Sequence, residues 1–388
     1  MSFSFDQLLQ FSYSLEDKQF LQCLLCLDGL GRKTAAQILF YLKKNNLSPD
    51  DFWVNLQDIL DKICVRKKIA NKINKHNLEQ ELQEINHSFI NDGIRVILFW
   101  EKEYPSLLLS TEDFPLLLYI KGDVGLLREK SVAVVGTRKM TSYGATATRK
   151  IVTELVDYGY TIISGCMYGV DAVVHQTALD SGGKTVAVLG YGFNQVIPIQ
   201  IGGLQKNILD KGGCLITEYL PSVSANKGTF PERNRIVAGM SLGVLVVEAA
   251  LKSGTHITAG CALEAGREVF AVPGSIFNPF AEGTKFLINQ GAKLVSSGSD
   301  IVAEFKKVVT IPNSGQADSV VDINIVLDAL NLDAVSHKVV RELLYLPQST
   351  DELAKVTQLT ITELLSVLGM LELENIIENE AGVWHCVL

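Results

Sequence analysis

The 388-residue sequence has no apolar run long enough for a membrane span, no disulfide pattern and no excess of basic residues. Apolar runs such as Val244–Val247 are far shorter than the roughly 20 residues that a transmembrane helix needs. Its first residues lack a basic stretch followed by an apolar core, so we expect no signal peptide. The seven cysteines are scattered and odd in number, which does not suit a disulfide framework. We therefore expect a cytoplasmic protein with no membrane association.

The glycine patterns of the common nucleotide sites are also missing. The strand expected before Gly136 is followed by Thr137 and Arg138, not by the second and third glycines of a dinucleotide fingerprint. Lys184 and the threonine after it resemble the end of a phosphate loop, but they enter a strand instead of a helix. The sequence therefore gives no support to NAD chemistry or ATP hydrolysis.

No cluster of metal ligands stands out, and we expect neither a metal nor another cofactor. Cys23 and Cys26 have the spacing of half a zinc site, but no second pair follows, so ordinary core packing is favoured. Asp171 and His175 lie four residues apart on a predicted helix, where they could serve acid–base chemistry. No nucleophile or third ligand accompanies them, so a structural hydrogen-bonded pair is the favoured interpretation.

The charge of the chain is unevenly distributed. Its net charge is −8, which by itself argues against binding to nucleic acid. Residues 317–388 carry 12 acidic and 3 basic side chains, however, whereas the first 316 residues carry 31 acidic and 32 basic ones. The excess of acidic residues lies in the C-terminal segment. The sequence is therefore compatible with anion binding by the first 316 residues.

Periodicity divides the chain into four parts: a helical domain over residues 1–100, an α/β domain over 101–308, a polar linker over 309–320 and a small helical unit over 321–388. The second part alternates short Val/Ile-rich strands with helices, which predicts a doubly wound, mostly parallel sheet. We expect its strands at about 131–136, 160–164, 185–190, 213–218, 243–248, 268–273 and 293–296. We expect helices between them at about 143–158, 171–181, 202–211, 231–241, 256–266 and 283–291.

Small and hydroxyl residues follow several of these strands. Because ligands of such sheets bind beyond the carboxyl ends of the strands, these residues predict a rim that binds phosphate through backbone N–H groups and hydroxyls. For Ser253 and Thr255, capping of the following helix is an equally good interpretation. The predicted rim consists of Gly136, Thr137, Ser164, Gly165, Ser253, Gly254 and Thr255.

Arginines add fixed charge near this rim. Arg138 carries a guanidinium whose fork suits a phosphate, with a surface salt bridge as the alternative. Arg233 and Arg235 flank Asn234 in the first turn of a predicted helix, where they oppose the helix dipole. A bound anion or a carboxylate such as Glu248 is expected to compensate them.

The motifs of residues 131–306 resemble the DprA/Smf DNA-processing family of bacteria. They are V-A-V-V-G-T-R, S-G-C-M-Y-G-V-D, T-V-A-V-L-G-Y-G, F-P-E-R-N-R-I, V-V-E-A-A-L-K-S-G-T-H-I-T-A and G-R-E-V-F-A-V-P-G, in that order. Met167 and the loop at 197–204 depart from the usual family pattern, so no contact is carried over from that loop.

This resemblance implies an extended Rossmann-like fold that binds single-stranded DNA, works as a homodimer and is not an enzyme. It also implies a role in loading RecA recombinase and protecting incoming DNA during natural transformation. The arginine of the family's G-[ST]-R motif falls on Arg138, and the rim residues follow with it. Arg233, Asn234 and Arg235 match the R-N-R motif, for which a structural role is as good an interpretation as DNA contact.

The flanking segments also resemble known DNA-binding units. Gly29–Lys33 resembles the turn of a SAM/helix-hairpin-helix-like domain that grips a phosphate, although a purely structural hairpin fits equally well. The basic side chains between Lys62 and Lys75 suit either a phosphate contact or a solvated surface. The C-terminal unit resembles a winged helix, but its acidity favours a protein-contact or regulatory module over duplex binding.

Two other functions remain open on the sequence alone. One is a Rossmann-like hydrolase that acts on a small nucleotide or phosphoriboside, which residues 274–284 faintly resemble. The other is a transcription regulator that reads duplex DNA through residues 317–388. Helix 283–292, with Phe286, Leu287 and Ile288, is the expected dimer contact.

Overall fold

The structure is a computed structural model that describes residues 3–27, 29–65, 70, 73–308, 332–345, 348–357, 359–373, 376–380 and 383–386. It divides into two compact units, Met1–Ser299 and Asp300–Leu388. The predicted linker over 309–320 and the helix expected over 322–331 lie outside the described residues. The predicted domain boundaries stay predictions, because the first unit contains both the helical segment and the sheet.

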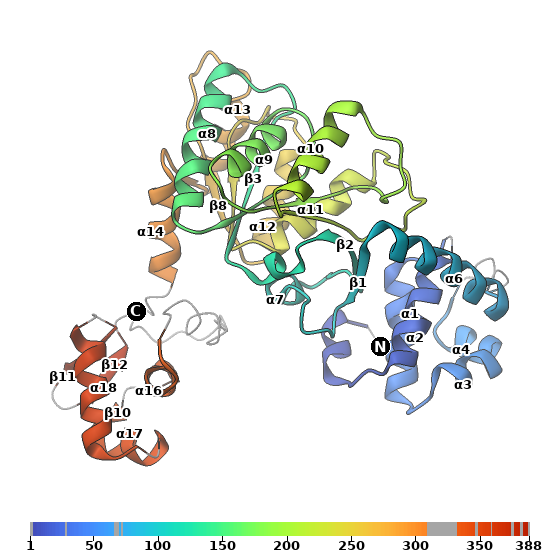
Figure 1. The fold of residues 1–388 in the computed structure, drawn as a ribbon, viewed down its shortest axis with the longest axis horizontal. Helices are drawn as coiled ribbons and strands as arrows, with labels where there is room; N and C mark the ends of the chain where they lie inside the picture. Colours follow the sequence, from blue (N-terminus) through green and yellow to red (C-terminus); the bar gives the residue numbers. More distant parts are fainter. Residues whose placement is uncertain are drawn as a thin grey trace. The chain divides into compact units, whose positions relative to one another are not determined.

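A nine-stranded sheet forms the centre of the first unit (Figure 1). Its strand order is β1-β2-β6-β5-β4-β3-β7-β8-β9. From β3 the chain adds strands first on one side and then on the other, so that β3 lies between β4 and β7. In β3, Ala133 pairs with Ile163 of β4 and with Val244 of β7, both in parallel. This is the predicted doubly wound arrangement. The parallel strands are β3 (Ser131–Val135), β4 (Thr161–Ser164), β5 (Thr185–Val188), β6 (Cys214–Thr217), β7 (Gly243–Val246), β8 (Glu268–Ala271) and β9 (Lys293–Leu294).

Two strands that the sequence analysis missed extend the sheet beyond β6. They are β1 (Ile94–Leu98) and β2 (Leu117–Gly122), which pair antiparallel with each other, and β2 pairs antiparallel with β6. The expectation that residues 1–100 are helical is therefore wrong for β1. The first four residues of β2 are all buried, and a short, fully apolar run does not distinguish a strand from a buried helix.

Helices cover both faces of the sheet. Right-handed crossovers place the helices of the two halves on opposite faces, because the strands progress in opposite directions from β3. Accordingly, α9 packs against α8 and α10, whereas α11 packs against α12. These helices are α8 (Ser142–Asp157), α9 (Val170–Asp180), α10 (Ile199–Asp210), α11 (Thr229–Gly239), α12 (Thr255–Glu264) and α13 (Glu282–Asn289). The next helix, α14 (Gly298–Val308), begins in the first unit and continues into the second.

The N-terminal helices start at clear capping residues. Ser14 and Ser48 each accept a hydrogen bond from the backbone three residues later, which satisfies an N–H group at the start of a helix. The elements before the parallel sheet are η1 (Phe5–Gln10), α1 (Leu15–Cys26), α2 (Arg32–Lys44), α3 (Pro49–Val54), α4 (Leu56–Lys62), α6 (Lys75–Asp92), α7 (Ser106–Leu109) and η2 (Val124–Arg128).

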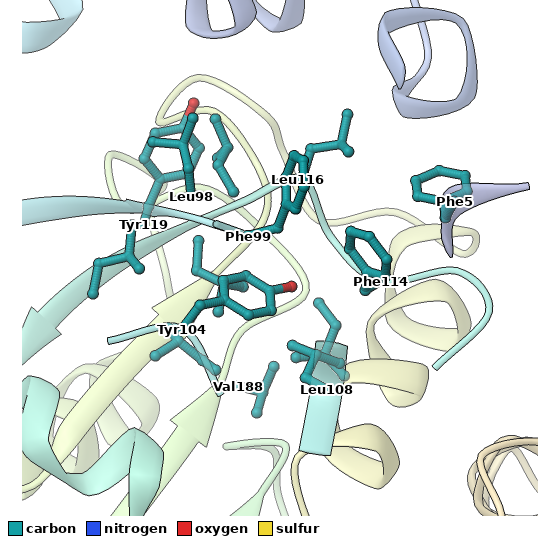
Figure 2. Close-up of a cluster of buried hydrophobic side chains, with 14 of the residues drawn as sticks. Phe5, Leu98, Phe99, Tyr104, Leu108, Phe114, Leu116, Tyr119 and Val188 are labelled. Atoms are coloured by element: carbon teal, nitrogen blue, oxygen red, sulfur yellow. The ribbon is translucent and has the colours of Figure 1, made fainter. Parts of the chain in front are cut away.

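One apolar core runs from these helices into the sheet (Figure 2). The ring of Phe5, on η1, meets the ring of Phe114 edge to face at 5.3 Å, and Phe99 after β1 lies 5.4 Å from Phe114. Tyr104 is buried beside them and donates its hydroxyl to the Pro115 carbonyl at 2.6 Å. The segment that follows α7 therefore joins the helical region to the sheet through buried aromatic rings.

In the second unit, the described residues after α14 form three helices and a small antiparallel sheet of order β10-β12-β11, the arrangement of a winged helix. Leu353, Leu364, Leu368 and Trp384 contribute to its core. Its elements are α16 (Ala334–Tyr345), β10 (Gln348–Ser349), α17 (Thr350–Thr357), α18 (Ile361–Leu373), β11 (Ile377–Glu380) and β12 (Val383–Cys386). Among the described residues, no single helix is long and apolar enough to cross a membrane. Helices α17 and α18 have the required length and composition only when taken as a pair, which is bent by 111°.

Candidate nucleic-acid interface

A hollow of about 770 Å³ lies beyond the carboxyl ends of β3, β4 and β7. Three parts of the chain line it, around residues 135–139, 226–234 and 250–258, together with Gly165, Met167 and Asp171. We call this site the strand-end hollow. It includes the point where the strand order reverses between β3 and β7, which is where open α/β sheets place their ligands.

The turn after β3 is held by the turn after β7. The Thr137 amide donates to the Glu248 carbonyl at 2.7 Å, and the Thr137 hydroxyl accepts from the Lys139 amide at 3.1 Å. Gly136 fits there because a Cβ atom would lie 2.6 Å from a methyl group of Val170. These contacts fix the backbone of the turn and leave the Arg138 side chain exposed.

The Arg138 guanidinium lies over the ring of Phe230, 5.2 Å from its centre. Among the ion pairs of the described residues none involves Arg138, so the surface salt bridge considered for it is not formed. Phe230, just after the start of α11, itself lines the hollow. The site thus offers a free cation against an aromatic face.

Three further exposed cations line the hollow: Lys139, Lys227 and Lys252. The sequence analysis did not select them. Lys139 and Lys252 directly adjoin predicted site residues, so adjacency was an available signal for both. Lys227 precedes α11 and is separated from Arg138 by almost 90 residues, so only the fold brings the two together.

In the turn after β4, the two predicted site residues Ser164 and Gly165 have different environments. Ser164 is fully buried, and its hydroxyl donates to the Val134 carbonyl at 2.7 Å. Gly165 lines the hollow, where a Cβ atom would lie 2.6 Å from the Arg233 guanidinium and 2.8 Å from the Asp171 carboxylate. Ser164 therefore braces the sheet, whereas Gly165 forms part of the hollow's wall.

Arg233 lines the floor of the hollow from within the protein. It is 4% exposed and donates to the carbonyls of Gly165, at 2.7 Å, and Val188. Burial lowers the pKa of the Arg233 guanidinium, while the charge of nearby Asp171 opposes this. Burial likewise raises the pKa of Asp171, and Arg233 opposes it. This buried arginine ties α11 to the ends of β4 and β5.

Its two predicted companions occupy different environments. Asn234 lines the hollow and accepts a hydrogen bond from Arg233 Nε at 3.2 Å. Arg235 lies outside the hollow, forms an ion pair with Glu218 and donates to the Asp113 carbonyl at 2.7 Å.

The carboxylate that compensates Arg235 is thus Glu218, and the expectation that Glu248 does so is wrong. Glu248 instead accepts three hydrogen bonds: the Thr141 amide at 2.8 Å, the Thr141 hydroxyl at 2.6 Å and the Asn278 side chain at 2.8 Å. It therefore holds the start of α8 in place.

The turn after β7 forms the far wall of the hollow. Ser253, Gly254 and Thr255 all line it, and α12 begins at Thr255. The Thr255 amide donates to the Ser253 hydroxyl at 3.2 Å, and the two hydroxyls lie 2.9 Å apart. Ser253 therefore accepts from the first amide of α12 and lines the hollow, whereas the N-cap residue is Gly254, which has no side-chain cap.

Asp171 and His175 do not form the hydrogen-bonded pair that was favoured for them. Asp171 accepts from the Met167 amide at 3.3 Å, whereas His175 lies fully buried with Nδ1 at 2.7 Å from the Thr185 hydroxyl. Burial lowers the pKa of His175 to about 3, so it is neutral at physiological pH. Within the described part of the chain, no group of three metal-ligating side chains comes together.

Helices α1 and α2 flank the hairpin predicted for a helix-hairpin-helix, but its arginine makes contacts within the protein. Arg32 forms ion pairs with Asp113 and with Glu232. In the neighbouring basic stretch, Lys62 pairs with Asp58 and Lys75 with Asp50. The other basic residues of that stretch, 66–68 and 72, lie outside the described residues.

The winged-helix unit lacks a basic surface on its third helix. Helix α18 contains no lysine or arginine, and its exposed side chains include Glu363 and Glu372. A phosphate backbone would be repelled by such a helix.

Comparison with known proteins agrees with this geometry. Residues 95–306 match the family DNA recombination-mediator protein A, and residues 327–382 match the DprA winged helix domain. Protein Smf of Escherichia coli is 46% identical over 199 residues, which cover 51% of this chain and 53% of that protein. DNA processing protein DprA of Bacillus subtilis is 39% identical over 234 residues, covering 59% of this chain and 78% of the relative.

Two solved structures extend the comparison. The X-ray structure of DNA processing protein A from Streptococcus pneumoniae superposes with a TM-score of 0.63 at 34% identity, covering 74% of this chain and 97% of that one. The Helicobacter pylori protein, whose structure was solved to show its single-stranded DNA binding mode, gives a TM-score of 0.50 at 27% identity, with 55% and 96% covered. On its central α/β motifs, its winged helix and these likenesses, the chain belongs to the DNA recombination-mediator protein A family, the DprA/Smf proteins.

Proposed function

We propose that this recombination mediator binds single-stranded DNA in the strand-end hollow, with Arg138 as the principal phosphate contact. The observation that carries the proposal is the gathering of four exposed cations, Arg138, Lys139, Lys227 and Lys252, in one hollow. Asp171 is the only carboxylate among the residues that line it, and Asp171 is buried against Arg233. The hollow therefore favours an anion.

The aromatic ring favours an unpaired strand over a duplex. Phe230 lies in the hollow beside the cations, so a base that reaches the ring can stack on it while its phosphates meet the lysines. Bases of a duplex are already stacked and paired and do not offer a free face. The rim residues Gly136, Thr137, Gly165, Ser253, Gly254 and Thr255 complete the proposed interface through their backbone amides and hydroxyls.

The hollow is better suited to binding than to catalysis. A hydrolase of small nucleotides needs a carboxylate or histidine that reaches its substrate and exchanges protons with it. Asp171 and His175 are instead buried, and each is committed to an internal partner. We therefore propose a protein without enzymatic activity, which helps to load RecA recombinase onto single strands during natural transformation. The proposed setting is the cytoplasm, where such strands and RecA meet.

We further propose that the chain works as a homodimer through α12 and α13. Of Phe286, Leu287 and Ile288, only Phe286 is exposed, at 45%. Its ring lies edge to face with that of His256 at 5.6 Å, which joins α13 to the start of α12. Helix α12 also exposes Ile257, at 43%, and Leu263, at 66%, so each of the two helices has exposed apolar side chains that a second copy can cover.

The test of the DNA-binding proposal is a salt series on the full chain with single-stranded and duplex DNA. Arg138→Ala should weaken single-strand binding about tenfold, because a charged hydrogen bond is lost. It should also lower the slope of log affinity against log salt by about 0.7 to 1. Arg149→Ala is the matched control, since this exposed arginine on α8 does not line the hollow.

Three results would contradict the proposal: an unchanged affinity and slope for Arg138→Ala, a preference for duplex, or turnover of nucleoside monophosphates without DNA. The last would favour the hydrolase.

A further inference from the structure

Helix α11 contributes side chains to the strand-end hollow and also forms an ion pair, through Glu232, with the N-terminal helical region. Phe230 and Asn234 line the strand-end hollow, and Lys227 lies on the exposed loop that leads into the helix. Gly228, the residue before α11, provides no side-chain cap. In the loop before the helix, Asn226 Oδ1 accepts from the Gly228 and Thr229 amides at 2.7 and 3.1 Å. Arg233 holds the inner side of the helix, and the outer side of the first turn depends on other contacts.

On the outer side, Arg32 of α2 holds the same turn. Its Nη1 atom forms an ion pair with Glu232, while Nε donates to Asp113 Oδ1 at 3.0 Å and Nη2 binds Asp113 Oδ2. The guanidinium thus binds Asp113 with two parallel hydrogen bonds and still reaches Glu232. Only the fork of an arginine can make both sets of contacts at once.

The pair belongs to a larger network at the junction of the helical region and the sheet. The Asp113 carbonyl also accepts from Arg235, which pairs with Glu218. The Tyr219 hydroxyl donates to Glu232 at 3.2 Å. The residue next to Asp113 is Phe114, whose ring contacts that of Phe5 (Figure 2).

The ionisation of these groups reflects their mutual contacts. Burial lowers the pKa of the Arg32 guanidinium, but the hydrogen bonds and charge of Asp113, with nearby Glu218 and Glu232, outweigh burial and raise it. Burial raises the pKa of Asp113, but Arg32 and Arg235 outweigh this and lower it. Arg32 is 22% exposed and Asp113 34%, so the pair is only partly screened by solvent.

We propose that Arg32 is a positioning residue for DNA binding, which acts through Glu232 and does not itself touch the strand. The helical region thereby fixes the first turn of α11, and with it Phe230 and Lys227, in the geometry that the hollow needs. This inference rests on the proposed function of the hollow. The inference gives the N-terminal helix-hairpin-helix-like segment a role other than binding a phosphate.

The charge of Glu232 provides the sharpest test. If Arg32 and Glu232 acted on DNA only through their own charges, Glu232→Gln would remove a repulsive carboxylate and tighten binding. If the two hold α11, Glu232→Gln should weaken single-strand binding by about fivefold, as should Arg32→Ala. The double variant should bind about as well as either single one, because both remove one contact.

The measurements are single-strand affinity across a salt series on the full chain, hydrogen exchange of the α11 amides and thermal stability. Arg32→Ala should leave the salt slope unchanged and speed exchange in the first turn of α11. Arg32→Lys should recover part of the affinity, since a lysine can hold one of the two carboxylates. Arg95→Ala, at an exposed arginine of β1, controls for the loss of one positive charge.

The idea is overturned if Glu232→Gln tightens binding, or if Arg32→Ala lowers the salt slope by about one, as a lost phosphate contact would. Arg138→Ala, measured in the same experiment, distinguishes a failure of the proposed DNA-binding site from a failure of the positioning role. If it has no effect, the proposed function itself fails. If it weakens binding while both Arg32→Ala and Glu232→Gln bind like the unaltered chain, only the positioning role fails. Should Arg32→Ala not fold, Glu232→Gln decides.

Discussion

Four arginines of the first unit have the same charge but different environments. Arg138 is exposed over an aromatic ring, Arg233 is buried against two carbonyls, and Arg32 and Arg235 pair with carboxylates. The sequence places Arg233 and Arg235 in the same helical turn and does not reveal this division. Their partners lie far away along the chain, and a partner's distance in sequence says nothing about its distance in space.

Substitution of Arg233 should therefore affect stability before it affects DNA binding. Arg233→Ala leaves the Gly165 and Val188 carbonyls without a donor and the Asp171 carboxylate buried without its countercharge. Breaking a buried pair in this way costs about 3 to 5 kcal/mol of the free energy of unfolding. Urea unfolding of the full chain, followed by circular dichroism, measures the loss.

Arg138→Ala is the comparison for this experiment, since an exposed side chain without an ion pair should change the unfolding free energy by at most about 0.5 kcal/mol. Equal stability of the Arg233→Ala variant and the unaltered chain would show that the buried contacts of Arg233 contribute nothing.

At the scale of elements, the parallel strands were predictable and the antiparallel edge was not. Strands β3 to β8 are Val/Ile-rich runs bounded by turn residues, and their order along the chain alternates with helices. Strand β2 has a similar composition, but its neighbour β6 lies almost 100 residues further along the chain. The turns of the hollow were predictable for the same reason as the strands. Lys227 and Phe230 were not, because they come from a crossover segment with no strand-end signal.

The dimer prediction belongs to α12 and α13. Phe286→Glu places a charge at an apolar side chain that is 45% exposed, and burying that charge in an interface would be costly. We expect this variant to be a monomer at concentrations where the unaltered chain is a dimer. Light scattering coupled to gel filtration measures the mass directly.

Leu251→Glu makes the same change at an apolar side chain that is 52% exposed and lies outside α12 and α13. If Leu251→Glu dissociates the dimer and Phe286→Glu does not, the interface lies elsewhere.

At the scale of the whole molecule, basic and acidic side chains are concentrated in different units. The strand-end hollow gathers cations in the first unit, whereas residues 317–388 carry 12 acidic and 3 basic side chains. Composition therefore indicated correctly that the total charge of −8 is a poor guide to the central domain. The winged-helix fold was also predictable from its helical pattern and terminal hairpin, and α18 without a basic residue supports the expectation that it does not bind duplex DNA.

Removal of residues 317–388 tests this separation. The shortened chain should bind single-stranded DNA at least as tightly as the full chain, because the acidic segment contributes repulsion and no phosphate contact. Any gain should be largest at low salt, where charges act over the longest distance, and should disappear at about 1 M salt. Fluorescence anisotropy with a labelled oligonucleotide follows both. A marked loss of affinity at every salt concentration would instead assign a DNA contact to the winged helix.

The contact between Arg138 and Phe230 has a consequence for how a strand is released. In the unbound protein the guanidinium already occupies the aromatic face that a base would use. A strand bound as proposed must displace it, so the arginine moves from ring to phosphate while the base takes the ring. The loss of the contact with the ring offsets part of the affinity that Arg138 gains at the phosphate, so the net gain at any single nucleotide is modest. Tight binding then accumulates only along many nucleotides, and a strand can be handed over stepwise to a competitor that takes it one nucleotide at a time.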